Sequence, residues 1–173
     1  VLADSSGVGA NLQDHLDVCS IDRCRQKITY DRSKPRNHVP DTLDAEIIRD
    51  GARFFEDGEK MQLSYAVRNT LRTIGTRASS HIVKKFGMRN SLQADHLTVK
   101  LSGSCGQSLG AFAVRGLKIE VQGDANDYVG KGLSGATITV RPSMTSPLKA
   151  EENTIIGNTV LYGATDGYLY ASG

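Results

Sequence analysis

The sequence predicts a mainly β fold, in which short strands stack as the coils of a solenoid and a helical segment precedes them. Residues 97–101 alternate apolar and polar side chains, as a half-buried strand does. The same alternation returns around Ile119 and Ile138, which lie 20 and then 19 residues further along the chain than Val99 and Ile119. Glycine is abundant, with 18 residues against 4 prolines, and most of it follows residue 100. Self-similarity at this period is typical of solenoid proteins.

The sequence divides into three parts. We expect an irregular N-terminal segment and linker over residues 1–40, a helical segment over 41–90 and a truncated β-helix over 91–173. Pro35 and Pro40 bracket a stretch that is predicted to be extended, because each proline disfavours helix in the residue before it. The chain opens on Val1 without an initiator Met or a signal-peptide pattern, so we expect it to be part of something larger.

Two helices are predicted within residues 41–90. The first begins at Asp41, a suitable N-cap, continues towards the two phenylalanines at 54 and 55, and ends at Gly58. The second has apolar residues at steps of three or four and ends at Gly87; they are Val67, Leu71, Ile74, Ala78, Ile82 and Phe86. Three arginines fall on this second helix, namely Arg68, Arg72 and Arg77. They form either a solvated basic face or a surface that pairs with another domain.

The predicted coils are separated by glycines and by one loop. Gly103 and Gly110 correspond to Gly123 and Gly130 at the same 20-residue shift. Residues 142–153 interrupt the third coil as a surface loop, and the apolar pattern then resumes at residues 155–156 and 160–161. A fourth coil is predicted to begin at the segment Tyr168–Tyr170. Its strand edge would be unpaired, so we expect self-association through this open end.

Composition excludes some classes of partner. The net charge is +2 and charged residues make up 23% of the chain, which gives no electrostatic reason to expect nucleic acid or an anionic membrane. No apolar run approaches the roughly 20 residues that span a bilayer. Cys19, Cys24 and Cys105 form no metal-ligand cluster, so free thiols and a cytoplasmic location are expected; a disulfide or metal at the first two stays an alternative.

Two motifs are open to a ligand-binding interpretation. The segment 130–135 matches the dinucleotide fingerprint G-x-G-x-x-G, but a β-branched segment follows it where that fingerprint needs a helix. Tight corners with positive φ are the favoured interpretation. The segment 123–128 contains Asp124 and Asp127 and is a candidate calcium loop or acid–base pair. We favour a turn whose Asp and Asn side chains bond their own backbone.

No catalytic constellation emerges from the remaining candidates. His15, His38, His81 and His96 are scattered, and none belongs to a nucleophile motif. Cys105 has no neighbour in the sequence that would activate it, so a small buried thiol is expected. We therefore predict no catalytic, cofactor-binding or metal-binding residue in this chain.

Long runs of the sequence resemble one known family. The segments 106–112, 123–135 and 152–165, together with 68–70 and 74–76, are similar to the C-terminal glycine-rich (GXGXG) domain of glutamate synthase large subunits. The resemblance covers about residues 35–173. Cys105 stands where the family usually has Ala, and Ala136 where it usually has Gly.

This resemblance implies a right-handed β-helix that is a structural, non-catalytic domain of an oxidoreductase of glutamate biosynthesis. The parent enzyme of such a domain converts glutamine and 2-oxoglutarate to two glutamates. In the family an N-terminal cysteine releases ammonia, and a separate barrel holds FMN and an iron–sulfur cluster; none of those motifs occurs here. The implied partners are other domains or subunits of glutamate synthase. The family domain also continues beyond residue 173.

The first 33 residues do not fit that family. Residues 7–16 resemble a short segment of the glucose–methanol–choline oxidoreductases, and a chimera, a gene fusion and coincidence are all open explanations. Two alternative functions follow. The first is that the chain is a fragment of a flavin-dependent alcohol or choline-type oxidoreductase. The second is that it is a solenoid binding module.

Overall fold

The computed structural model describes residues 33, 41–88 and 92–173. The chain divides into two units, residues 1–39 and 40–173, and the following account concerns the second. The predictions for residues 1–32 and 34–40 lie outside the described residues. They include the segment 7–16, the proline-bracketed linker, the pair Cys19 and Cys24, and the pair His15 and His38.

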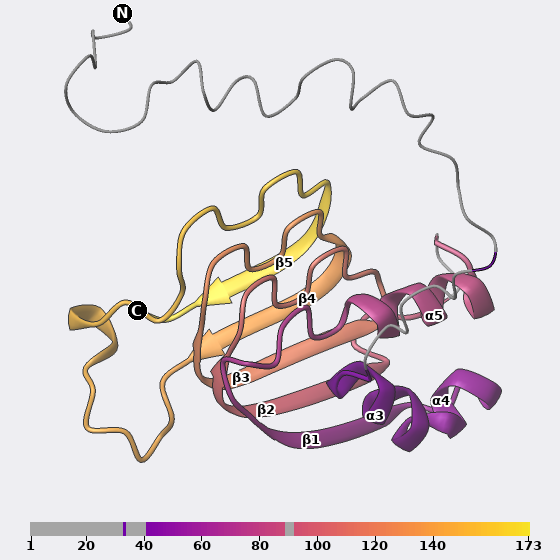
Figure 1. The fold of residues 1–173 in the computed structure, drawn as a ribbon, viewed down its shortest axis with the longest axis horizontal. Helices are drawn as coiled ribbons and strands as arrows, with labels where there is room; N and C mark the ends of the chain where they lie inside the picture. The colour runs from indigo at the N-terminus through magenta and orange to yellow at the C-terminus, as the bar shows by residue number, and fades with distance from the viewer. Residues whose placement is uncertain (1–32, 34–40, 89–91) are drawn as a thin grey trace, which may run out of the picture. The chain divides into compact units, whose positions relative to one another are not determined.

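Five parallel strands form the centre of the second unit, and they pair in chain order (Figure 1). They are β1 (Met61–Val67), β2 (Leu97–Cys105), β3 (Leu117–Ala125), β4 (Ser134–Arg141) and β5 (Asp166–Ala171). Leu97 lies opposite Leu117 and Ile119 opposite Ile138, so the strands stack at the predicted shifts of 20 and 19 residues. The predominance of β structure in the second half is confirmed. The sheet is open, and the right-handed β-helix is considered below as a proposal.

The helices lie beside the end of the sheet where the strands begin (Figure 1). They are α3 (Leu43–Asp50), α4 (Ala52–Asp57) and α5 (Thr76–Phe86), and a short 3-10 helix, η2 (Ala150–Glu152), follows β4. Gly58 ends α4 with φ 75°, and Gly87 ends α5 with φ 82°, both as predicted. The first predicted helix is in fact two helices, because the helical conformation is interrupted at Gly51. Thr42 occupies the N-cap position of α3, so the prediction of Asp41 was wrong.

The prediction of one long helix from Val67 to Phe86 was wrong in its first half. The segment Met61–Val67 is strand β1, and it pairs along its whole length with β2. Val67 and Ile74 are buried from the end of a strand and from a turn, and their spacing imitates a helical stripe only by chance. Pairing with β2 decides the outcome here, since tertiary contacts override local periodicity. The three arginines consequently share no helix, and only Arg77 lies on α5.

The segments that lead from one strand to the next also stack on one another. Thr73, Ser108, Tyr128 and Thr159 occupy the same place in successive segments, and all four have positive φ, between 54° and 64°. The N–H of Ser108 donates to the carbonyl of Asp127 at 2.8 Å, and that of Tyr128 donates to Asn158 at 2.9 Å. Each return segment is therefore hydrogen-bonded to the next, in the same order as the strands.

Glycine is required where this stack approaches the core. Gly110 has φ 64°, and a Cβ added there would overlap Cδ1 of Ile138. Gly123 lies opposite Gly103 in the sheet, and a Cβ on Gly123 would overlap the carbonyl oxygen of Gly103. The 20-residue glycine repeat in the sequence thus marks the positions where successive coils come closest.

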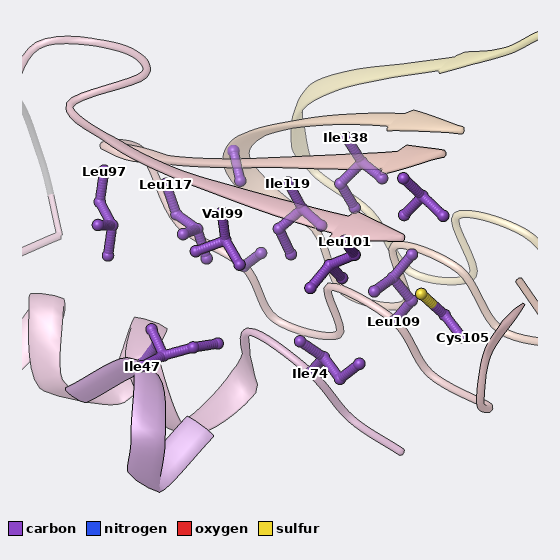
Figure 2. Packing of buried hydrophobic residues seen from close by; sticks show 14 of the residues in the cluster. Ile47, Ile74, Leu97, Val99, Leu101, Cys105, Leu109, Leu117, Ile119 and Ile138 are labelled. Atoms are coloured by element: carbon purple, nitrogen blue, oxygen red, sulfur yellow. The ribbon is translucent and has the colours of Figure 1, made fainter. Parts of the chain in front are cut away.

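The core lies between the sheet, its return segments and helix α3 (Figure 2). Alternate residues of the strands point inwards, and Ile47 of α3 and Ile74 of the first turn pack against them. Burying an aliphatic side chain of this size contributes about 1.5–3 kcal/mol. The inward-facing strand residues that are at most 1% exposed are Leu97, Val99, Leu101, Cys105, Leu117, Ile119, Val121, Ala136, Ile138 and Val140.

Candidate functional site

Cys105 is the one cysteine among the described residues, and it lies at the end of β2. Its side chain is fully buried, beside Leu101 and Leu109 (Figure 2). Burial raises the pKa of the thiol to about 12, and the negative charge of Asp124 adds to the effect. A thiol with this pKa stays protonated at neutral pH, so it is a poor nucleophile and a poor metal ligand. The prediction of a small buried thiol is confirmed.

The two carboxylates of the segment 123–128 link neighbouring coils. Asp124 accepts a hydrogen bond from the hydroxyl of Ser104, its partner in the adjacent strand. Asp127 accepts a hydrogen bond from the backbone N–H of Asn158 at 2.8 Å, in the next return segment. The expectation that these side chains bond their own backbone is corrected, because their hydrogen bonds run between coils.

The glycine-rich segment 130–135 has the conformation predicted for it. Gly130, Gly132 and Gly135 have φ of 65°, 64° and 116°, and strand β4 follows where a nucleotide-binding fingerprint needs a helix. The N–H of Gly130 donates to Leu109 at 2.8 Å and that of Gly132 donates to Tyr162 at 2.8 Å. These amides, which would face a phosphate in such a fingerprint, donate to the neighbouring coils.

Asp44 has a role in the fold that the sequence did not predict, although a carboxylate was expected in the first turn of this helix. It lies on α3, is 1% exposed, and accepts backbone hydrogen bonds at the start of α5 from Gly75 at 2.7 Å, Arg77 at 2.6 Å and Ala78 at 3.1 Å. Burial raises its pKa above the ordinary value, while the three N–H groups and the charge of Arg77 act in the opposite direction. The positive end of the α5 dipole is thereby occupied by the protein's own carboxylate. A signal was present, since Asp44 stands between Leu43 and Ile47 on the buried face of the predicted helix.

The two described histidines contact a backbone carbonyl and an aromatic ring, and not other potential catalytic side chains. His96 lies 2.7 Å through Nε2 from the carbonyl oxygen of Gly58, and His81 packs edge-on against Phe55. Within the described part of the chain, no three His, Cys, Asp or Glu side chains gather where they could hold a metal ion. None of the helices described is long and apolar enough to cross a membrane.

A groove of about 390 Å³ lies between the carboxyl ends of β2 and β3 and the loop that follows β4. This loop confirms the predicted interruption of the third coil. Asp124 is the only charged residue in the groove, and its carboxylate is engaged by Ser104. The remaining lining is polar but uncharged, apart from glycines and a few apolar residues: Ser102, Gly103, Ser104, Gln122, Gly123, Pro142, Ser143, Ser146, Leu148, Asn153, Thr154 and Ile155. The groove offers hydrogen bonds but no free charge to a ligand.

The last strand leaves an aromatic surface exposed. Tyr168 and Tyr170 are 62% and 58% exposed, and their rings stack with centroids 6.2 Å apart. Strand β5 pairs with β4 on one side, and no described strand pairs with its other edge. An unpaired edge beside large exposed rings is typical of a surface that another part of a protein covers.

Comparison with known proteins supports one family. The GXGXG motif family matches residues 44–173, which contain every strand described above. The chain is 66% identical over 138 residues to the glutamate synthase [NADPH] large chain of Azospirillum brasilense, covering 80% of this chain and 9% of that one. It is 41% identical over 145 residues to the glutamate synthase [NADH] of Schizosaccharomyces pombe, covering 84% and 7%. The ferredoxin-dependent glutamate synthase 2 of Synechocystis is 48% identical over 110 residues, covering 64% and 7%. The chain therefore spans less than a tenth of the length of these relatives.

Proposed function

The chain belongs to the GXGXG family of glutamate synthase large chains, and from this we propose that it is a scaffold domain that packs against the other domains of such an enzyme. In this role the segment holds neighbouring domains in place and contributes no catalytic group. The parent enzyme would convert glutamine and 2-oxoglutarate to two glutamates in the cytoplasm.

The observation that carries this proposal is the use of the candidate polar groups within the fold itself. Asp44 caps α5, Asp124 and Asp127 join neighbouring coils, and Cys105 is buried as a neutral thiol. The amides of the glycine-rich segment donate to adjacent coils in the same way. A catalytic site needs groups that are free to meet a substrate, whereas these groups stabilise the stack.

We also propose that the coils form a right-handed β-helix. Two features support this. The strands pair in parallel in chain order, and the return segments between them are themselves hydrogen-bonded in that order. Connections between successive parallel strands are almost always right-handed, because a twisted strand allows the chain to return over the sheet only that way.

The cofactors of the parent enzyme are proposed to lie in its other domains. An iron–sulfur cluster takes about four cysteine thiolates, and the described residues contain only the buried Cys105, so they do not fit such a cluster. Incubation of the chain with FMN or FAD, followed by removal of free flavin, tests this for the flavins. We expect an absorption spectrum without flavin bands; stoichiometric bound flavin would contradict the proposal and favour the flavoprotein alternative suggested by residues 7–16.

A segment exchange tests the scaffold role in an intact enzyme. The matching 138-residue segment of the A. brasilense large chain is replaced by the corresponding segment of this chain, and the product is called the exchanged large chain. We expect it to assemble and to retain glutamine-dependent glutamate synthesis, while the 173-residue chain alone shows none.

Three comparisons make this experiment decisive. An exchanged large chain with Gly110→Ala should lose assembly, because that substitution disrupts the stack of coils. Glutamate synthesis by the isolated 173-residue chain would overturn the scaffold proposal. So would full activity of a large chain from which the segment has been deleted.

A further inference from the structure

One corner of the coil stack combines an unfavourable backbone conformation with an exposed aromatic ring. Phe112 has φ 57°, in the left-handed region, and its side chain is 56% exposed. The equivalent residues of the next two return segments are Gly132 and Gly163, which adopt the same conformation without steric cost. Non-glycine residues do occupy this region at another repeated position of the stack, Ser108 and Tyr128 among them, so what sets Phe112 apart is the combination of glycine equivalents and an exposed ring.

Further large side chains lie on the return segments that follow the one with Phe112. Its N–H donates to the carbonyl of Lys131 at 2.7 Å, and its ring lies over Gly132, whose own N–H donates to Tyr162. Tyr162 is 64% exposed, and Tyr128 is 38% exposed beneath the ammonium group of Lys131, 5.6 Å from the ring centroid. We call the four residues Phe112, Tyr128, Lys131 and Tyr162 the corner patch.

The fold itself does not explain this patch. A glycine at position 112 would relieve the backbone strain, and the half of the Phe112 ring that faces solvent gains nothing from burial. Lys131 has no carboxylate within salt-bridge distance in the described part of the chain. Exposed aromatic anchors next to an unpaired cation are typical of a protein interface.

We propose that the corner patch is the docking surface through which this segment packs against another domain of the same large chain. The partner would present an apolar pocket for the Phe112 ring and an acidic side chain for Lys131. This rests on the proposed scaffold function. In the relatives, the matched segment is only 7–9% of the chain, so more than nine-tenths of the parent lies outside it and can cover the patch.

A photo-crosslinker identifies the occupant directly. Phe112 is replaced by p-benzoylphenylalanine in the exchanged large chain, which is irradiated, digested and analysed by mass spectrometry. We expect a cross-link to a peptide of the same chain outside the exchanged segment. A cross-link to a second copy or to another subunit would overturn the proposal, and so would the absence of any cross-link. An exchanged large chain that is assembled and active but not cross-linked refutes the docking surface alone, whereas failure to assemble refutes the scaffold function.

A second measurement separates docking from folding. Phe112→Gly removes the ring and relieves the strain, so the unfolding temperature of the isolated 173-residue chain should stay the same or rise. In the exchanged large chain the same substitution should lower that temperature and speed limited proteolysis several-fold. Ser108→Gly is the matched control, since it relieves a similar φ of 62° outside the patch and should weaken neither protein. An equal loss of stability in both proteins with Phe112→Gly would show that the ring serves only the fold.

Discussion

Asp44 accepts the backbone N–H of Gly75 at 2.7 Å across 31 residues of sequence, and so joins the first described helix to the start of α5. The other oxygen of the same carboxylate accepts the N–H groups of Arg77 and Ala78. One buried side chain therefore accepts three of the N–H groups at the start of α5 that have no acceptor within the helix. The carboxylate thereby links α3 to the N-terminus of α5.

We expect Asp44→Ala to destabilise the chain by about 2–3 kcal/mol, because it leaves three amides without an acceptor, two of them buried and that of Arg77 partly buried. Urea unfolding followed by circular dichroism measures the loss. Glu46→Ala is the control: Glu46 is exposed on the same helix and its loss should change stability by less than about 0.5 kcal/mol. Equal effects of the two substitutions would mean that the cap contributes little.

Gly110→Ala should destabilise the chain by about 2–4 kcal/mol, since the new methyl group overlaps Ile138 and the residue is held at φ 64°. Gly163→Ala is the matched control. Gly163 has a similar φ of 68°, but no heavy atom lies within 4 Å of a Cβ added there. The substitution should therefore lower stability by only about 1–2 kcal/mol, through the backbone conformation alone.

Ile138→Val tests the cause of the Gly110→Ala effect. It removes Cδ1, the atom that the new methyl group would meet. In a double-mutant cycle, the loss of stability caused by Ile138→Val should therefore be smaller in the Gly110→Ala variant than in the unsubstituted chain. Strict additivity would mean that the overlap is relieved elsewhere.

These positions also show how far the sequence could predict the structure. The 20-residue repeat located β2, β3 and β4, because every coil must repeat the same apolar and glycine positions to stack. It could not locate β1, since the first coil has no predecessor to repeat and Val67, Leu71 and Ile74 happen to be spaced like a helix. The place of Asp44 on the apolar face of the predicted helix signalled a buried carboxylate, but its partners could not be predicted, because they lie 31 to 34 residues away and are backbone amides that carry no sequence signature.

Alkaline pH should destabilise the chain through Cys105. Its pKa rises from 9.0 to about 12 on folding, so between these values the unfolded chain has lost the proton and the folded chain retains it. Stability from this group is therefore complete below pH 9 and is lost as the pH rises towards 12. The free energy of unfolding of Cys105→Ala should fall less steeply with pH over this window. The smaller side chain should itself lower that free energy by about 1 kcal/mol at every pH. Unfolding curves at pH 8, 9 and 10 compare the two proteins, and identical slopes would contradict the assignment.

The open edge of β5 should cause the isolated chain to self-associate. Tyr168 and Tyr170 place two stacked rings beside the unpaired backbone of this strand, and such an edge can pair with the same edge of another copy. Sedimentation velocity across a wide concentration range measures the association. The double substitution Tyr168→Lys and Tyr170→Lys should shift the chain towards monomer, because opposed lysines repel and the rings no longer stack. Met144→Lys, at an 80% exposed position of the loop after β4, adds charge away from the edge and should leave the association unchanged. If the unsubstituted chain stays monomeric at every concentration, the β5 edge is protected by its own twist or side chains. The prediction of self-association through this edge would then be wrong.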